Sequence, residues 1–392
     1  MKIMIPNYIN TAINVLENAG FEAFVVGGCV RDALLKKTPQ DYDIATSATP
    51  EEIISLFPHT VPTGIKHGTI TVVFENNETT EITTFRTEGN YSDSRHPENV
   101  TFVKNIKEDL SRRDFTVNAM AYSQKNGLID PFGGLSDLEN KVLRAVGIPA
   151  LRFSEDALRI LRLFRFSSQL EFKIEDNTYD CALKLAKNLS NISRERIRDE
   201  LIKGLCGKNP EVLKELIATD CLSFLGIGKN CFNFDNLNKA SNCHTSRFSY
   251  FCFINDLDPL KIAQNLRCSK VFGKTCENIC LLLKRSIPTN KTEIKQILKT
   301  FPINDFNEYL NTLCPFRNVS KINAFLKEII DNNEAFSLSQ LSVNGNDLQK
   351  LGIKDKEIKI VLDKLLDFVI KNPEANTKEQ LLELVSKYKT PP

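Results

Sequence analysis

The stretch GGCVRDALLKKTPQDYDIAT, residues 27–46, decides how the N-terminal part of the chain is interpreted. Gly27 and Gly28 lie between an expected strand and an expected short helix, where their backbone N–H groups can approach phosphate oxygens. Asp41 and Asp43 are alternate residues of an expected strand, so their side chains face the same side. Two adjacent carboxylates repel each other unless a cation lies between them, and such oxygen ligands suit Mg²⁺. The stretch therefore predicts a site for metal ions and phosphates.

The composition is that of an ordinary globular protein. The chain of 392 residues, with 42% hydrophobic and 26% charged content, is too long for one compact core. No apolar run approaches the roughly 20 residues of a membrane span, and residues 1–20 lack a signal-peptide pattern. Eleven cysteines, an odd number without metal-binding spacing, favour reduced thiols in the cytoplasm. The formal net charge of +2 leaves a nucleic-acid partner open, because basic residues could line one face.

Secondary-structure patterns divide the chain near residue 150. Before that point strands and helices are mixed, and residues 87–100 are polar enough to predict a loop. Strands are expected at 21–26 and 41–46 and in a hairpin at 68–86 that turns at Asn76 and Asn77, and helices at 7–19, 29–35 and 49–57. From residue 151 helical periodicity dominates, one helix is expected over 151–170, and no later strand is expected. The fold class predicted is therefore α+β, with an α/β domain followed by an all-helical remainder.

Five motifs, taken together, are specific where each alone is weak. Residues 27–46 are followed by SDSRHPENV (92–100), SRRDFTVNAMAY (111–122), SEDALRILRLFRF (154–166) and ISRERIRDEL (192–201). In this order they resemble the motifs of the class II tRNA nucleotidyltransferase and bacterial poly(A) polymerase family. The resemblance covers roughly the first 200 residues. It implies a polymerase-β-like nucleotidyltransferase head and a helical neck, body and tail, with boundaries expected at 1–150, 151–207, 208–325 and 326–392.

The resemblance also implies roles for individual residues. Two Mg²⁺ ions would bind Asp41 and Asp43, with Glu81 as a third catalytic carboxylate on the neighbouring strand. Arginine forks suit phosphate oxygens, so Arg112 and Arg113 would handle the triphosphate, while Asp114 would accept a hydrogen bond from the ribose. The nucleotide-binding set implied by the motifs is completed by Gly27, Gly28, Arg31, Asn118 and Arg162.

The segment SEDALR offers a way to choose between bases. A carboxylate accepts from the exocyclic amine of cytosine or adenine, and an arginine donates to the neighbouring ring nitrogen, whereas guanine and uracil present the reverse pattern. The resemblance assigns these roles to Asp156 and Arg159, which lie three apart on the expected helix. The plain alternative is a surface helix that Ser154 caps, with an i,i+4 pair between Glu155 and Arg159.

Two further motifs carry weaker assignments. SDSRHP resembles the family's flexible loop, which helps to accommodate ATP, and its matching residues are Asp93, Arg95 and His96. Ser94 stands where that loop usually has glycine. ISRERIRDEL places Arg194, Arg196 and Arg198 on one expected helix, where they could brace the neck or contact tRNA phosphates.

The sequence therefore predicts an enzyme that adds CCA to the 3′ end of tRNA from CTP and ATP, without a nucleic-acid template, releasing pyrophosphate. An A-adding tRNA nucleotidyltransferase and a poly(A) polymerase are the alternatives within the family. A non-catalytic RNA-binding protein is the alternative from another class, but it should have lost Asp41 or Asp43. No His-Asp pair of the phosphohydrolase type is visible, and no membrane or protein partner is indicated.

Overall fold

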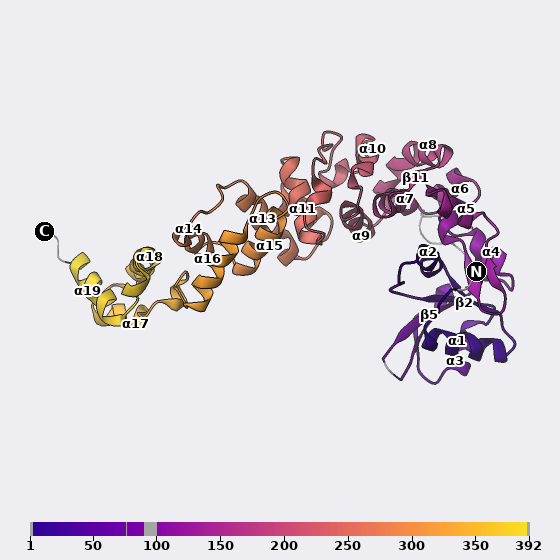
Figure 1. Ribbon diagram of the computed structural model, residues 1–392, viewed down its shortest axis with the longest axis horizontal. Helices are drawn as coiled ribbons and strands as arrows, with labels where there is room; N and C mark the ends of the chain where they lie inside the picture. The colour runs from indigo at the N-terminus through magenta and orange to yellow at the C-terminus, as the bar shows by residue number, and fades with distance from the viewer. Residues whose placement is uncertain (1–2, 76, 90–99, 390–392) are drawn as a thin grey trace. The chain divides into compact units, whose positions relative to one another are not determined.

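The computed structural model describes residues 3–75, 77–89 and 100–389. The chain forms two compact units: Met1–Phe234 with Asn265–Arg267, and Asp235–Gln264 with Cys268–Pro392. Figure 1 shows the sheet in the indigo and magenta N-terminal part of the chain, and helices alone in the orange and yellow part. The predicted fold class, a mixed α/β head followed by helices, is confirmed.

A seven-stranded sheet in the order β3-β4-β5-β2-β1-β8-β9 forms the centre of the first unit. Strands β2 and β5 pair in parallel, and every other neighbouring pair in this sheet is antiparallel. The strands are β1 Ala23–Val26, β2 Asp43–Thr46, β3 Thr60–Gly64, β4 Thr69–Val73, β5 Thr79–Thr84, β8 Ala121–Ser123 and β9 Gly127–Ile129.

Register between β1 and its neighbours brings three motifs to one end of the sheet. Val26, the last residue of β1, pairs with Asp43 on one side and Ala121 on the other. All four residues of β1 are buried, which suits a central strand covered on both faces. The glycine turn after β1, the carboxylate that starts β2 and the segment before β8 therefore meet at this end.

The hairpin of β4 and β5 is confirmed, whereas the predicted loop 87–100 is only partly so. Its ends form a short antiparallel ladder, β6 Arg86–Glu88 with β7 Val100–Phe102. Backbone pairing between β6 and β7 places these mostly polar residues in strands, which their sequence pattern did not predict. Asp93, Arg95 and His96 lie outside the described residues.

The helices predicted in the head are confirmed. Thr49 caps α3 with a capping box, as its sequence TPEE predicts. The first unit contains α1 Asn7–Asn18, α2 Gly28–Leu34, α3 Pro50–Leu56, α4 Ile106–Ser111, α5 Gly134–Glu139, α6 Pro149–Glu155, α7 Leu158–Leu170, α8 Asp176–Leu185, α9 Arg194–Leu205 and α10 Leu213–Ala218.

The prediction of a single helix over 151–170 is wrong, because the helix is interrupted at Asp156. Asp156 is extended, with φ −141° and ψ 103°, and its carboxylate accepts from the backbone N–H of Leu158 at 3.0 Å. An aspartate that bonds to the backbone two residues ahead competes with helix continuation. Ser154 donates to the carbonyl of Ala150 instead of capping. The expectation of no later strand is also wrong, since β11 Lys173–Ile174 pairs in parallel with β10 Val142–Leu143.

Helices make up the described part of the second unit. One core surrounds Phe306 and Tyr309 and another surrounds Leu365 and Val369. The helices from here to the C-terminus are α11 His244–Ile254, α12 Pro259–Asn265, which crosses between the units, α13 Lys270–Leu283, α14 Lys291–Leu298, α15 Ile303–Leu313, α16 Ser320–Asp331, α17 Gly345–Lys350, α18 Asp355–Lys371 and α19 Lys378–Lys389. Within the described ranges no helix has the length and apolar content needed to cross a membrane.

Candidate active site

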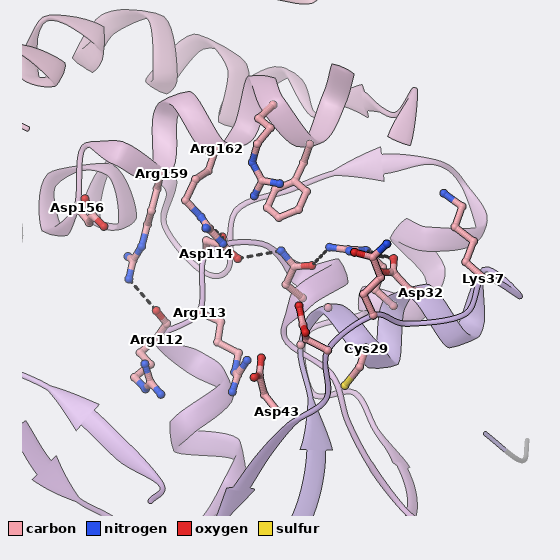
Figure 2. A pocket seen from close by; sticks show the side chains of 18 of the residues that line it. Cys29, Asp32, Lys37, Asp43, Arg112, Arg113, Asp114, Asp156, Arg159 and Arg162 are labelled. Atoms are coloured by element: carbon pink, nitrogen blue, oxygen red, sulfur yellow. Dashed lines mark hydrogen bonds and ion pairs between the residues drawn. The ribbon is translucent and has the colours of Figure 1, made fainter. Parts of the chain in front are cut away.

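A polar cavity of about 1060 Å³ opens in the first unit at the end of the sheet where the motifs meet. Figure 2 shows it from close by, with side chains entering from the sheet, from α4 and from α7. It brings together thirteen of the residues that the sequence singles out: Gly27, Gly28, Arg31, Asp41, Asp43, Arg112, Arg113, Asp114, Asn118, Asp156, Arg159, Arg162 and Arg196.

Gly27 forms the turn from β1 into α2. Its φ of +77° lies where residues with a side chain are strained. A Cβ built on Gly27 would lie 2.9 Å from Nη1 of Arg113, closer than atoms pack. The backbone conformation therefore favours glycine at this position, and any side chain here would displace the Arg113 guanidinium.

The carboxylates gather at the start of β2. Asp43 is the first residue of this strand, but Asp41 lies before it, so strand alternation does not explain their placement as predicted. Glu81 on β5 is the register partner of Asp43, although it does not line the cavity.

The electrostatics at Asp43 fit a cation. Desolvation by the surrounding protein raises the pKa of Asp43. The positive charge of Arg113 lowers this pKa, and the negative charges of Glu81 and Asp41 raise it. Repulsion among neighbouring carboxylates is relieved by a divalent ion. Nowhere in the described chain do three His, Cys, Asp or Glu side chains form a preformed metal cluster. Of the carboxylates that line the cavity, Asp41 and Asp43 at the start of β2 could hold a metal ion together with the phosphates of a ligand.

Asp109, which the sequence reasoning missed, holds the two arginines of the RRDF motif. It is fully buried and accepts from Nη2 of Arg112 at 2.8 Å and of Arg113 at 3.2 Å. Burial alone would raise the pKa of Asp109, but Arg113 and Arg112 outweigh it and hold the pKa below its ordinary value. Its position three and four residues before these arginines on α4 was a readable signal.

Asp114 connects the head to α7. Its carboxylate accepts from Nε and Nη2 of Arg162 at 2.9 and 2.7 Å, and from the amide of Asn118 at 3.1 Å. Asn118 in turn accepts from Nη1 of Arg31 at 2.7 Å. Burial opposes ionisation of Asp114, but Arg162 and these hydrogen bonds lower its pKa to about 2. Figure 2 shows the labelled Asp114 and Arg162 side by side.

Asp156 and Arg159 both line the cavity, but each has its own partners. Asp156 pairs with Arg196 of α9, with a shortest N–O distance of 2.7 Å. Arg159 pairs with Glu155 and donates to the carbonyl oxygen of Arg112 at 2.9 Å. The Glu155 pair of the plain alternative therefore exists, but Arg159 is only 8% exposed and does not lie on an open surface.

The cavity is strongly basic. Its described lining contains nine arginine and lysine side chains against five aspartates, an excess of four positive charges. Arg165 and Phe166 line it, although sequence reasoning passed over both, and the three-residue repeat of Arg159, Arg162 and Arg165 on α7 was the available signal. Chemically, the cavity suits a polyphosphate with a divalent cation at the Asp43 end.

Two family models and several known proteins match the chain. Residues 23–144 match the family model of the poly A polymerase head domain. Residues 171–225 match the model described as "Probable RNA and SrmB- binding site of polymerase A". A CCA-adding enzyme of Ligilactobacillus salivarius is 38% identical, over 98% of this chain and 97% of its own length. The chain belongs to the class II CCA-adding enzyme family.

Other members of the CCA-adding enzyme family support the assignment. The enzyme of Enterococcus faecalis is 51% identical over 56% of this chain and 55% of its own length. The crystal structure of the Bacillus stearothermophilus CCA-adding enzyme in complex with CTP superposes with a TM-score of 0.82 and 28% identity, over 98% of this chain and 99% of that one. The predicted enzyme class, a tRNA nucleotidyltransferase, is confirmed with the family, whose members generally use divalent metal ions.

We expect Gly27→Ala to weaken phosphate binding by roughly tenfold, because relieving the contact with its new Cβ would displace the Arg113 guanidinium. Isothermal titration with inorganic tripolyphosphate measures the affinity. Gly20→Ala is the matched control, since Gly20 also has positive φ but a Cβ there meets nothing within 4 Å. Both variants should lose stability, whereas unchanged tripolyphosphate affinity in Gly27→Ala would contradict the account.

Proposed function

We propose that the chain adds CCA to the 3′ end of tRNA, using CTP twice and ATP once, with two Mg²⁺ ions held by Asp41 and Asp43. The observation that carries the proposal is that one cavity contains these carboxylates, the arginine forks and the Asp156–Arg159 region. A nucleotidyltransferase needs all three groups: metal-binding carboxylates to neutralise the leaving group, arginines to bind the triphosphate, and a region that selects the base.

The carboxylate end would handle the reacting phosphate. When bound, the ions would supply positive charge to the attacking 3′-oxygen and to the leaving pyrophosphate. Asp43 and Asp41 would ligate them, and Glu81 beside Asp43 would add negative charge that strengthens cation binding. Arg112 and Arg113, held by Asp109, would donate to the triphosphate oxygens.

The Asp114 network would orient the nucleotide between the two ends of the cavity. Because Arg162 and Asn118 hold the carboxylate ionised, Asp114 can accept a hydrogen bond from the ribose 2′-hydroxyl. Arg31, fixed by Asn118 and adjacent to the glycine turn, would face the phosphates. No side chain is then needed as a dedicated base, since metal coordination lowers the pKa of the attacking hydroxyl.

The base would be chosen by Asp156 and Arg159. Arg196 holds the Asp156 carboxylate, and Glu155 and the backbone hold Arg159, so both groups are oriented before a base arrives. A carboxylate accepts from the amine of cytosine or adenine, while a carbonyl of guanine or uracil would meet it with repulsion. We extend the flexible-loop role, accommodation of ATP, to Asp93, Arg95 and His96 on family resemblance alone.

The remaining assignments follow the same proposal. We assign residues 1–150 to the catalytic head, 151–207 to the neck, 208–325 to the body and 326–392 to a tail that binds tRNA. We also propose a cytoplasmic location, since the eleven cysteines are all free thiols, the state that a reducing compartment maintains.

The complete activity is tested with a tRNA transcript lacking its CCA end, in Mg²⁺, with CTP alone, ATP alone or both. We expect two additions with CTP and three with both nucleotides, read as product masses. A single A added only to tRNA ending in CC would identify an A-adding enzyme, and a long A ladder would identify a poly(A) polymerase.

Asp43→Asn should lower kcat by about a hundredfold or more, because the amide keeps the volume but cannot balance the charge of a metal ion. Single-turnover addition of C at several Mg²⁺ concentrations measures the effect. Glu51→Gln, an exposed carboxylate of α3 outside the cavity, is the control. Near-normal turnover in Asp43→Asn would mean that the metal assignment is wrong.

Arg159→Ala should reduce discrimination against GTP and UTP by roughly tenfold or more, since the donor to the ring nitrogen is lost. The ratio of kcat/KM values for correct and wrong nucleotides is the readout. Arg152→Ala is a matched control, because Arg152 also pairs with Glu155 but does not line the cavity. Discrimination should survive in Arg152→Ala, and its survival in Arg159→Ala would refute the base-reading role.

A further inference from the structure

Phe166 lies at the centre of a cluster of three arginines. The ring is 6% exposed, belongs to α7 and lines the cavity. The guanidinium carbons lie 3.8 Å from its centroid for Arg165, 5.1 Å for Arg31 and 5.4 Å for Arg162. These are cation–π distances, and Arg31 reaches the ring from α2, far away in the sequence.

Three guanidinium groups so close together repel one another. Arg31 pairs with Asp32, Arg162 with Asp114 and, at 3.5 Å, with Glu200, and Arg165 with Glu200. Polar links therefore join the arginines two at a time: Asn118 and Asp114 connect Arg31 with Arg162, and Glu200 connects Arg162 with Arg165. The Phe166 ring contacts all three cations directly.

The ring itself is held by the RRDF motif. Phe115, which follows Asp114, packs edge-on against Phe166 with centroids 5.9 Å apart and an interplanar angle of 83°. Both rings are buried, and this geometry leaves little freedom to turn. The orientation of Phe166 is therefore set by the same motif that supplies Arg112 and Arg113.

The arginine cluster lies beside the glycine turn. A Cβ on Gly28 would be 3.6 Å from Nη2 of Arg31, so this guanidinium borders the backbone that can approach phosphates. Asp156 forms its ion pair with Arg196 and Arg159 with Glu155, while Arg162 also lies within electrostatic range of Asp156. Through Arg31 the cluster borders the phosphate end of the cavity, and Arg162 lies on its side nearer Asp156.

We infer that Phe166 is a positioning residue whose ring holds Arg31, Arg162 and Arg165 in the array that binds the triphosphate of the incoming nucleotide. The inference rests on the proposed function and adds Phe166 and Arg165 to it. Loss of the ring removes the face that all three mutually repelling cations share and leaves the pairwise links through Asn118, Asp114 and Glu200, so the array spreads and phosphate contacts weaken.

Phe166→Leu tests this, because leucine keeps an apolar side chain but has no aromatic face. Isothermal titration in Mg²⁺ with CTP, CMP and pyrophosphate separates phosphate binding from base binding. We expect affinity for CTP and pyrophosphate to fall roughly five- to tenfold, as loss of several partly buried cation–π contacts implies, with CMP affinity little changed. Phe166→Tyr should restore most of the loss.

Phe164→Leu is the matched control for simple loss of packing. Phe164 lies on the same helix and is 1% exposed, but its ring packs against Tyr179. This variant should lose thermal stability while keeping pyrophosphate affinity. Phe166→Leu binding pyrophosphate as wild type does, or losing CMP and CTP affinity in equal proportion, would overturn the inference.

These binding measurements do not depend on turnover. A wild-type protein that fails to extend tRNA would defeat the proposed function, whereas the loss of pyrophosphate affinity in Phe166→Leu is read without catalysis. The steady-state KM for CTP and for ATP should rise together in Phe166→Leu, because both nucleotides carry the same triphosphate. A rise for one nucleotide alone would contradict a phosphate-positioning role.

Discussion

The charge pair between Asp114 and Arg162 is the interaction on which the rest of the site depends. Asp114 belongs to the head, while Arg162 belongs to α7, and two hydrogen bonds of 2.9 and 2.7 Å join them. Through Asn118 the same carboxylate fixes Arg31. A buried pair of this kind specifies geometry more than it adds stability, because desolvation offsets most of its attraction. Its effect here is to hold sheet and helix in one register around the cavity.

Charge compensation explains how so many arginines share one small volume. Asp109, Asp114 and Glu200 are each under a tenth exposed; Asp109 and Glu200 each pair with two arginines, and Asp114 accepts twice from Arg162 and once from Asn118. Asp114 is already counted among the five lining aspartates, whereas Asp109 and Glu200 pair with lining arginines from outside the lining, so together they reduce the local excess of four positive charges to two. The supporting acids are thus as necessary to the site as the residues that face it.

The features that could be predicted from the sequence are those set by residues close together in the chain. The glycine turn, the capped helix α3 and the β4–β5 hairpin follow from local turn and capping chemistry. Most of the cavity lining could be named because the motifs are compact. The interruption of the helix at Asp156 could not be predicted, because the Asp156 carboxylate causes it by accepting from the backbone N–H of Leu158 and pairing with Arg196. Phe166 was passed over because a buried ring on an amphipathic helix is usually only core, and its arginines come from two helices.

Strand register also determines where the chain can change length. Asp43 is placed by its pairing with Val26, so its position depends on the β1–β2 ladder and not on the path between α2 and β2. Extra residues in that connection would leave Asp43 where it is, but residues added after Asp41, which lies in the connection and lines the cavity, would separate the two carboxylates. A slip of one residue in the ladder would instead turn Asp43 to the opposite face of the sheet. Insertions and deletions in this enzyme should therefore fall before Asp41 and be absent from the segment 41–43 and from the ladder.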